Sequence, residues 1–245
     1  MSMKTLVLSL PRMASKQITF NLYRYFLARH ESVSVIHKVV DIEPSLDELF
    51  NIWHHRFKCK LVRDGNNLIR TTDAIASASD EIENRCKLVS ELNGPYVIKH
   101  FPSENDITSF LINQVDRVYT LSRNDIFSNA LSMCVSKISK AWIKSSYQEK
   151  AIADMIEVPV IVLADEFSYA IRQILYYNKT YLTDTAYILE FNDICAISNS
   201  FDFCKLLNLE YIEFDFIKVG EEFGDNKTKM ISNMSELEDI YACLV

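Results

Sequence analysis

Basic and hydroxyl side chains follow the first apolar run of the chain. Residues 4–10, KTLVLSL, lead into a polar turn, PRMASKQ (11–17), after which apolar residues recur at helical spacing. The N-terminus of a helix presents unpaired backbone N–H groups and a partial positive charge, so it attracts anions. The turn is therefore either a phosphate site or an ordinary strand–helix turn with surface cations. The residues that would hold the phosphate are Arg12, Ala14, Ser15, Lys16 and Gln17.

This turn differs from the phosphate loop of nucleoside triphosphatases. Aligned with GxxxxGK[ST], the stretch LPRMASKQ keeps only Lys16, because both glycines and the magnesium-binding hydroxyl are missing. The stretch VIVLADE (160–166) imitates the strand that ends in a magnesium-binding aspartate, here Asp165, although an acidic helix start produces such a string routinely. A small-molecule kinase or triphosphatase is thus an alternative that only Lys16 and Asp165 support.

Two later strands also end in residues that can do chemistry. His100 follows the run YVIK, and an imidazole near neutral pKa can act as a general base. A histidine that only packs and hydrogen-bonds there is the alternative. Arg123 leaves the strand RVYTLS, and Ser132 lies on the next helix, in a row of serines spaced by four residues. That row is either a small-residue packing face or, through Ser132, a partner for Arg123 on a phosphate.

The elements that must position these residues alternate between strand and helix. Strands are expected at 4–10, 32–40, 96–101, 117–122, 186–191 and 210–216, helices at 14–29, 44–53, 72–92, 104–114, 125–144, 200–208 and from 235, and either a strand or a buried helix start at 158–164. Such alternation predicts βαβ units, hence an α/β fold with a three-layer parallel sheet flanked by helices. Ligands in such folds bind at the carboxyl ends of strands.

Composition limits the classes of function. The 245 residues fit a single α/β domain spanning 1–245, and about half of them are apolar. A net charge of −7 argues against a protein that coats nucleic acid, but allows a local basic pocket for a small anion. The six cysteines show no zinc spacing, and no apolar run approaches a membrane span of roughly 20 residues. We therefore expect a reduced, cytoplasmic protein without a membrane partner.

Taken together, the three strand ends resemble sulfotransferases that use 3′-phosphoadenosine 5′-phosphosulfate (PAPS). The family's first loop reads roughly P-[KR]-S-G-[ST]-[ST], and PRMASK fills it here, with Ala14 in place of the glycine. IKHFP is similar to the family's K-T-H-L-P stretch and aligns His100 with its base. RNDIFSNALS matches its arginine–serine pair with Arg123 and Ser132, at the longer spacing of bacterial members.

The resemblance extends toward the end of the chain. SMCVSKISKAW is like the family's S-x-x-x-A-x-x-x-x-x-W helix, and YILEFNDI is similar to its Y-E-D-L strand end. KVGEEFGDNKTK looks like a loosened R-K-G-x-x-G-D-W-K loop, which places Gly220 and Lys227 in the nucleotide site. The composition, rich in lysine, asparagine, isoleucine and tyrosine, hints at a bacterial or phage genome.

The resemblance implies a P-loop-like fold and a metal-free sulfuryl transfer from PAPS to a hydroxyl of a small molecule or glycan. Arg12 and Lys16 would stabilise the charge between the leaving phosphate and the sulfuryl group, and Ser15 would hold the 5′-phosphate. Arg123 and Ser132 would hold the 3′-phosphate, and His100 would take the acceptor's proton. Two alternatives stay open: a non-catalytic nucleotide-binding relative, which the glycine-free loop supports, and the kinase or triphosphatase named above.

Overall fold

Five parallel strands form the central sheet of the computed structural model, which describes residues 3–29, 34–37, 60–64, 67–71, 90, 95–102, 107–139, 160–182, 187–218 and 234–245. The sheet order is β2-β5-β1-β6-β7, and every neighbouring pair is parallel. The carboxyl ends of the strands therefore lie at one edge, with β1 between β5 and β6. The bounds are β1 Lys4–Leu8, β2 Ser34–His37, β5 Tyr96–His100, β6 Arg117–Ser122 and β7 Tyr187–Glu190.

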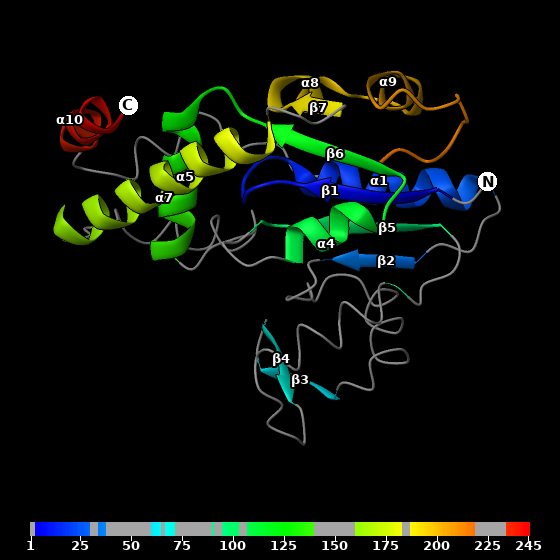
Figure 1. Cartoon of the computed structure of the whole chain (residues 1–245), viewed down its shortest axis with the longest axis horizontal. Coiled ribbons are helices and arrows are strands. Elements are labelled where there is room, and N and C mark those ends of the chain that lie inside the picture. The colour runs from blue at the N-terminus through cyan, green and yellow to red at the C-terminus, as the bar shows by residue number, and fades with distance from the viewer. Residues whose placement is uncertain are drawn as a thin grey trace.

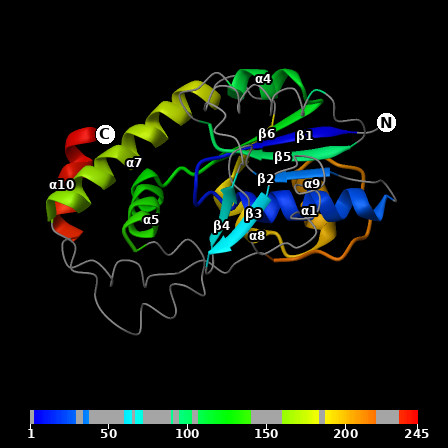
Figure 2. The ribbon, with the colours of Figure 1, turned by 90° about the horizontal axis from the view of Figure 1, so that it is seen from below.

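Helices cover both faces of this sheet, as predicted for a three-layer α/β fold. Figure 2 shows α4 (Ile107–Asn113) on one face and α1 (Ser15–Ala28), α8 (Phe191–Ala196) and α9 (Ser200–Leu206) on the other. Three further helices, α5 (Ile126–Ser139), α7 (Val160–Tyr181) and α10 (Met234–Leu244), pack together beyond the edge to which β6 points (Figure 1). No helix in the described part of the chain is long and apolar enough to span a membrane.

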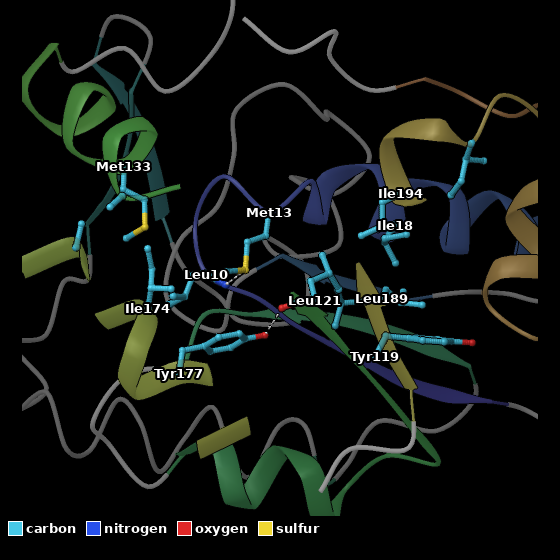
Figure 3. Close-up of a cluster of buried hydrophobic side chains, with 14 of the residues drawn as sticks. Leu10, Met13, Ile18, Tyr119, Leu121, Met133, Ile174, Tyr177, Leu189 and Ile194 are labelled. Carbon is cyan, nitrogen blue, oxygen red and sulfur yellow. Dashed lines mark hydrogen bonds between the residues drawn. The ribbon is translucent and has the colours of Figure 1, made fainter. Parts of the chain in front are cut away.

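A buried tyrosine ties α7 to the carboxyl edge of the sheet. The Tyr177 hydroxyl lies 2.8 Å from the carbonyl oxygen of Leu121 in β6 and 3.1 Å from that of Leu8 in β1. Burial raises the pKa of Tyr177 far above its ordinary value, so the hydroxyl stays protonated and donates at any physiological pH. Figure 3 shows this side chain reaching from α7 into the cluster of buried apolar residues. The two strand ends that precede Arg12 and Arg123 are thereby held together.

The segment at 158–164 is helical from Val160, where its described residues begin. Residues from Val160 belong to α7, whose buried positions Phe167, Ala170, Ile171 and Ile174 follow helical spacing without a break. The interpretation of VIVLADE as a strand ending in a magnesium-binding aspartate is wrong, because Asp165 lies exposed within this helix. The kinase or triphosphatase alternative loses one of its two supports.

The strand predicted at 210–216 is also wrong. Residues 209–218 are described without regular secondary structure, although Phe214 and Phe216 alternate inward and contact Phe203. The side chain of Asn21 in α1 takes the place of a neighbouring strand, since it donates to the carbonyl of Ile217 and accepts from the N–H of the same residue. The alternation therefore reflects packing on helices rather than pairing in a sheet.

A second sheet was not predicted. The strands β3 (Lys60–Asp64) and β4 (Asn67–Thr71) form an antiparallel pair between the helices predicted at 44–53 and 72–92, where no strand was expected. The helices predicted at 44–53 and 72–92 lie outside the described residues, except for Ser90, which is helical. The other predicted elements are confirmed over the residues that the structure describes.

Candidate functional site

The loop after β1 takes its shape from two buried apolar side chains. Leu10 and Met13 are 5% and 0% exposed, and the N–H of Leu10 donates to the Met13 sulfur at 3.4 Å (Figure 3). Arg12 and Ala14, on either side of Met13, both have positive φ, at 68° and 55°. Positive φ disfavours residues with a Cβ, and alternating backbone conformations of this kind form concavities that bind anions. The loop thus reaches without glycine a conformation for which glycine is the usual residue.

The first turn of α1 has no side-chain cap at its N-cap residue, and the N–H of Gln17 donates to the Ala14 carbonyl at 3.0 Å. Ala14 occupies the N-cap position in the left-handed conformation, and its side chain has no oxygen to accept from the backbone N–H groups of this turn. Of the remaining residues predicted here, Lys16 is half-buried, whereas Ser15 and Gln17 are 5% and 4% exposed. The arrangement favours an anion near Ala14, because the uncapped N–H groups and the helix dipole act in the same direction.

Replacing Ala14 with glycine is expected to raise the free energy of unfolding by about 0.5–1 kcal/mol. Glycine removes the Cβ clash at φ 55° and is a better N-cap residue than alanine. Ala170→Gly, in the interior of α7, is the matched control and should lower stability by about 1 kcal/mol. Urea unfolding of the three proteins measures both changes, and a loss of stability in A14G equal to that of A170G would contradict the backbone conformation described here.

Arg12, Ser132 and Arg123 meet at the carboxyl edge of the sheet. The Nε of Arg12 donates to the Ser132 hydroxyl at 2.9 Å, across 120 residues of sequence. One guanidinium nitrogen of Arg123 donates to the Arg12 carbonyl at 3.2 Å. Two cationic side chains and a buried hydroxyl from three separate segments therefore converge, as the strand ends predicted. This places the positive charge beside the uncapped start of α1.

Arg123 is held in place by the last residue of β7 and by the residue that follows it. Its guanidinium lies 4.2 Å from the ring centroid of Phe191, a cation–π contact. Glu190 accepts from the Ser122 hydroxyl and, at 3.1 Å, from the backbone N–H of Asn124, so that it bonds the residues on both sides of Arg123. Neither Glu190 nor Phe191 was predicted as a site residue. Their position at the end of a predicted parallel strand was the signal that could have found them.

His100 ends β5 and is 3% exposed. Its Nε2 lies 3.0 Å from the Thr108 hydroxyl in α4, and its carbonyl accepts from the N–H of Ser9 at 3.2 Å. Burial lowers the pKa of His100 to about 4, so the imidazole is neutral at pH 7. The residue thus lies next to the loop that follows β1, but its ring is enclosed and bonded to protein.

The lysine of IKHFP lies in β5, and two other predicted residues fall outside the described part of the chain. Lys99 is 2% exposed, next to His100 in β5, and its ammonium lies 4.9 Å from the ring centroid of Phe101. Successive strand residues point to opposite faces, so Lys99 and His100 face different helix layers. Gly220 and Lys227, expected in the nucleotide site, lie outside the described residues.

Comparisons with known proteins give little further information. The chain matches no protein-family model and no curated protein. Similar solved structures include a ParA family ATPase from Chlorobium tepidum TLS, with 10% identity, a TM-score of 0.33, and 99% of this chain and 93% of that chain covered. A GTPase from Pyrococcus abyssi in its apo form has 11% identity and a TM-score of 0.28 over 78% of this chain and 94% of that one. At such TM-scores, the function must be argued from the site itself.

Proposed function

We propose that this chain binds a nucleotide with phosphates on both the 3′ and 5′ positions, and that it is a PAPS-dependent sulfotransferase. The observation that carries the proposal is the convergence of Arg12, Arg123 and Ser132, through hydrogen bonds that join the end of β1, the end of β6 and α5. Two separate cationic groups suit a ligand with two separate phosphates, since arginine binds phosphate through a fork of N–H donors.

Each phosphate has its own set of donors in this proposal. The uncapped N–H groups at the start of α1, with Arg12, Ser15 and Lys16, take the 5′-phosphosulfate. Arg123, whose guanidinium lies over the Phe191 ring, and Ser132 take the 3′-phosphate. The 3′-phosphate replaces the Arg12 side chain as the partner of the Ser132 hydroxyl, while the Arg12 guanidinium turns to the 5′ group. The existing contact between Arg12 and Ser132 thus marks where the two phosphate sites adjoin.

The transfer step needs positioning and charge stabilisation rather than a covalent intermediate. Sulfuryl transfer resembles phosphoryl transfer, in which the group passes in line through a loose transition state. The acceptor oxygen forms a bond to sulfur as the bond to the 5′-phosphate oxygen breaks, and adenosine 3′,5′-bisphosphate leaves. Arg12 and Lys16 stabilise the charge on the leaving phosphate. The acceptor hydroxyl of a small molecule or glycan loses its proton to a base, for which His100 is the candidate.

The environment of His100 favours one alternative, a nucleotide-binding protein without transfer activity. A base must reach the acceptor's proton, and here the ring is 3% exposed and bonded to Thr108. A pKa of about 4 also makes the imidazole a weak proton acceptor at pH 7. Transfer through His100 therefore requires the ring to leave Thr108, whereas nucleotide binding alone requires no such movement.

Titration calorimetry and a turnover assay test the proposal. We expect adenosine 3′,5′-bisphosphate to bind without magnesium and more tightly than ATP with magnesium, because only the former offers a 3′-phosphate to Arg123. A preference for ATP with magnesium would contradict the proposal and favour a kinase or triphosphatase. With PAPS and candidate acceptors, His100→Ala should abolish transfer while nucleotide affinity is retained. Binding without turnover in the native protein would support the non-catalytic alternative.

A further inference from the structure

The side chain of Asn129 is buried in α5 without a hydrogen-bond partner. It is 0% exposed, and neither its Nδ2 nor its Oδ1 has a partner among the residues that the structure describes. Its backbone N–H is satisfied, since it donates to the Asp125 carbonyl at 3.1 Å. A buried carboxamide with both its donor and its acceptor unsatisfied destabilises the fold, and such a group in a native protein calls for an explanation.

Helical spacing places this carboxamide beside the proposed 3′-phosphate site. Asn129 and Ser132 are three residues apart, so they lie on the same face of α5, one turn from each other. Ser132 is the residue that accepts from Arg12, and Arg123 lies at the entry to the same helix. A phosphate bound between the Arg123 guanidinium and the Ser132 hydroxyl would therefore lie next to the helical turn that carries Asn129.

We propose that Asn129 recognises the ribose at this position, and this inference rests on the proposed function. A phosphate alone offers only acceptors, so it would satisfy Nδ2 and leave Oδ1 unpaired. A ribose 3′-phosphate offers an acceptor oxygen and, on the adjacent carbon, a 2′-hydroxyl that donates. The Nδ2 group donates to the phosphate and Oδ1 accepts from the 2′-hydroxyl. Asn129 is then a specificity residue that distinguishes ribonucleotides from 2′-deoxyribonucleotides.

Nucleotide binding exposes the Asn129 carboxamide to the ligand when the 3′-phosphate replaces the Arg12 side chain at the Ser132 hydroxyl. When the Arg12 guanidinium turns from Ser132 to the 5′ group, the bond that links the loop after β1 to this face of α5 is broken. The 3′-phosphate then bonds to Ser132, and the ribose lies against the preceding turn. In this arrangement Ser132 bonds to the 3′-phosphate, and Asn129, one turn earlier in α5, bonds to the phosphate and to the adjacent 2′-hydroxyl.

The experiment compares two ligands on two proteins. Titration calorimetry measures adenosine 3′,5′-bisphosphate and its 2′-deoxy analogue against the native chain and Asn129→Leu, which has nearly the same size but no polar atoms. We expect the native chain to prefer the ribonucleotide about tenfold, the loss associated with leaving one buried acceptor unpaired. In N129L the preference should disappear, with thermal unfolding at or above the native temperature. Asn129→Asp, which retains an acceptor for the 2′-hydroxyl, should bind both ligands more weakly and keep the preference.

Each result has a distinct meaning. If the native chain binds neither bisphosphate, the proposed function fails and this inference fails with it. If the native chain binds both ligands equally, or if N129L retains the tenfold preference, the inference is overturned while the nucleotide site stands. An ordered water that satisfies Asn129 would produce that second pattern, together with lower stability of N129L. A preference present in the native chain and in N129D but lost in N129L supports the assignment.

Discussion

Arg123→Ala is expected to weaken the binding of adenosine 3′,5′-bisphosphate about 100-fold. Arg123 contributes charged hydrogen bonds to the proposed 3′-phosphate, and bonds of this type contribute about 1.5–3 kcal/mol. Its guanidinium is already oriented by the Phe191 ring, at 4.2 Å, and by the Arg12 carbonyl, so little ordering entropy opposes binding. Titration calorimetry at fixed ionic strength measures the loss, because phosphate binding depends on salt.

A ligand without the 3′-phosphate provides the decisive control. Adenosine 5′-phosphate should bind equally to the native chain and to R123A, because it does not use Arg123. Arg172→Ala removes an exposed arginine from α7 and should affect neither ligand. Arg123→Lys should recover only part of the affinity, since an ammonium keeps the charge but lacks the planar fork. An equal loss for both ligands would mean that R123A disturbs the loop after β1 rather than a 3′-phosphate contact.

The sheet was predictable because its signal is local and repeated. Each parallel strand is a short, largely apolar run that a helical pattern follows, and the central strands β1 and β5 are buried on both faces. Parallel pairing then requires that residues following different strands meet at one edge, which is why Arg12 and Arg123 were expected to lie together. Their contact in the structure follows from this topology, and neither residue had to be recognised by a motif of its own.

The errors arose where a periodic pattern fits two structures. VIVLADE is a short apolar run that matches either a buried strand or a helix, and only the continuation through Phe167 and Ile174 decides. The stretch at 210–216 alternates as a strand would, but its Asp215 carbonyl accepts from the side chain of Arg24. The backbone of Ile217, the residue after this stretch, pairs with the side chain of Asn21, 196 residues away in sequence. Alternating apolar residues indicate which side chains are buried, but they do not indicate the hydrogen-bond partners of the backbone.

The packing around each site residue could not be predicted from the sequence. The charge of Arg123 was readable, but its stacking on Phe191 depends on the place of β7 next to β6. The absence of glycine from the first loop suggested a less accommodating backbone, yet Arg12 and Ala14 adopt positive φ there. The sequence also gave no measure of the burial of His100 or of the isolation of Asn129, since both depend on how helices close over the sheet.

The last prediction concerns His100 and the stability of the fold in acid. Its pKa is about 4 in the folded chain and 6.5 as the ordinary value, so the unfolded chain binds more protons between these two pH values. Stability from this residue is therefore complete above pH 6.5 and is lost as the pH falls toward 4. The lowered pKa of His100 corresponds to a loss of about 3 kcal/mol in the free energy of unfolding over this pH range. His100→Gln lacks this titration, so the native chain should lose about 3 kcal/mol more than H100Q between pH 7 and pH 4.

Urea unfolding of both proteins at several pH values measures this difference, and the carboxylates and the other four histidines cancel because both chains contain them. Thr108→Val removes the partner of the ring and should lower stability at every pH without altering the slope that His100 causes. Parallel curves for the native chain and H100Q would show that the ring is accessible to water.

The same titration bears on transfer, because a base of pKa about 4 accepts a proton poorly at pH 7. If His100 is the base, saturating adenosine 3′,5′-bisphosphate must expose the ring, and the excess acid sensitivity of the native chain over H100Q should then shrink.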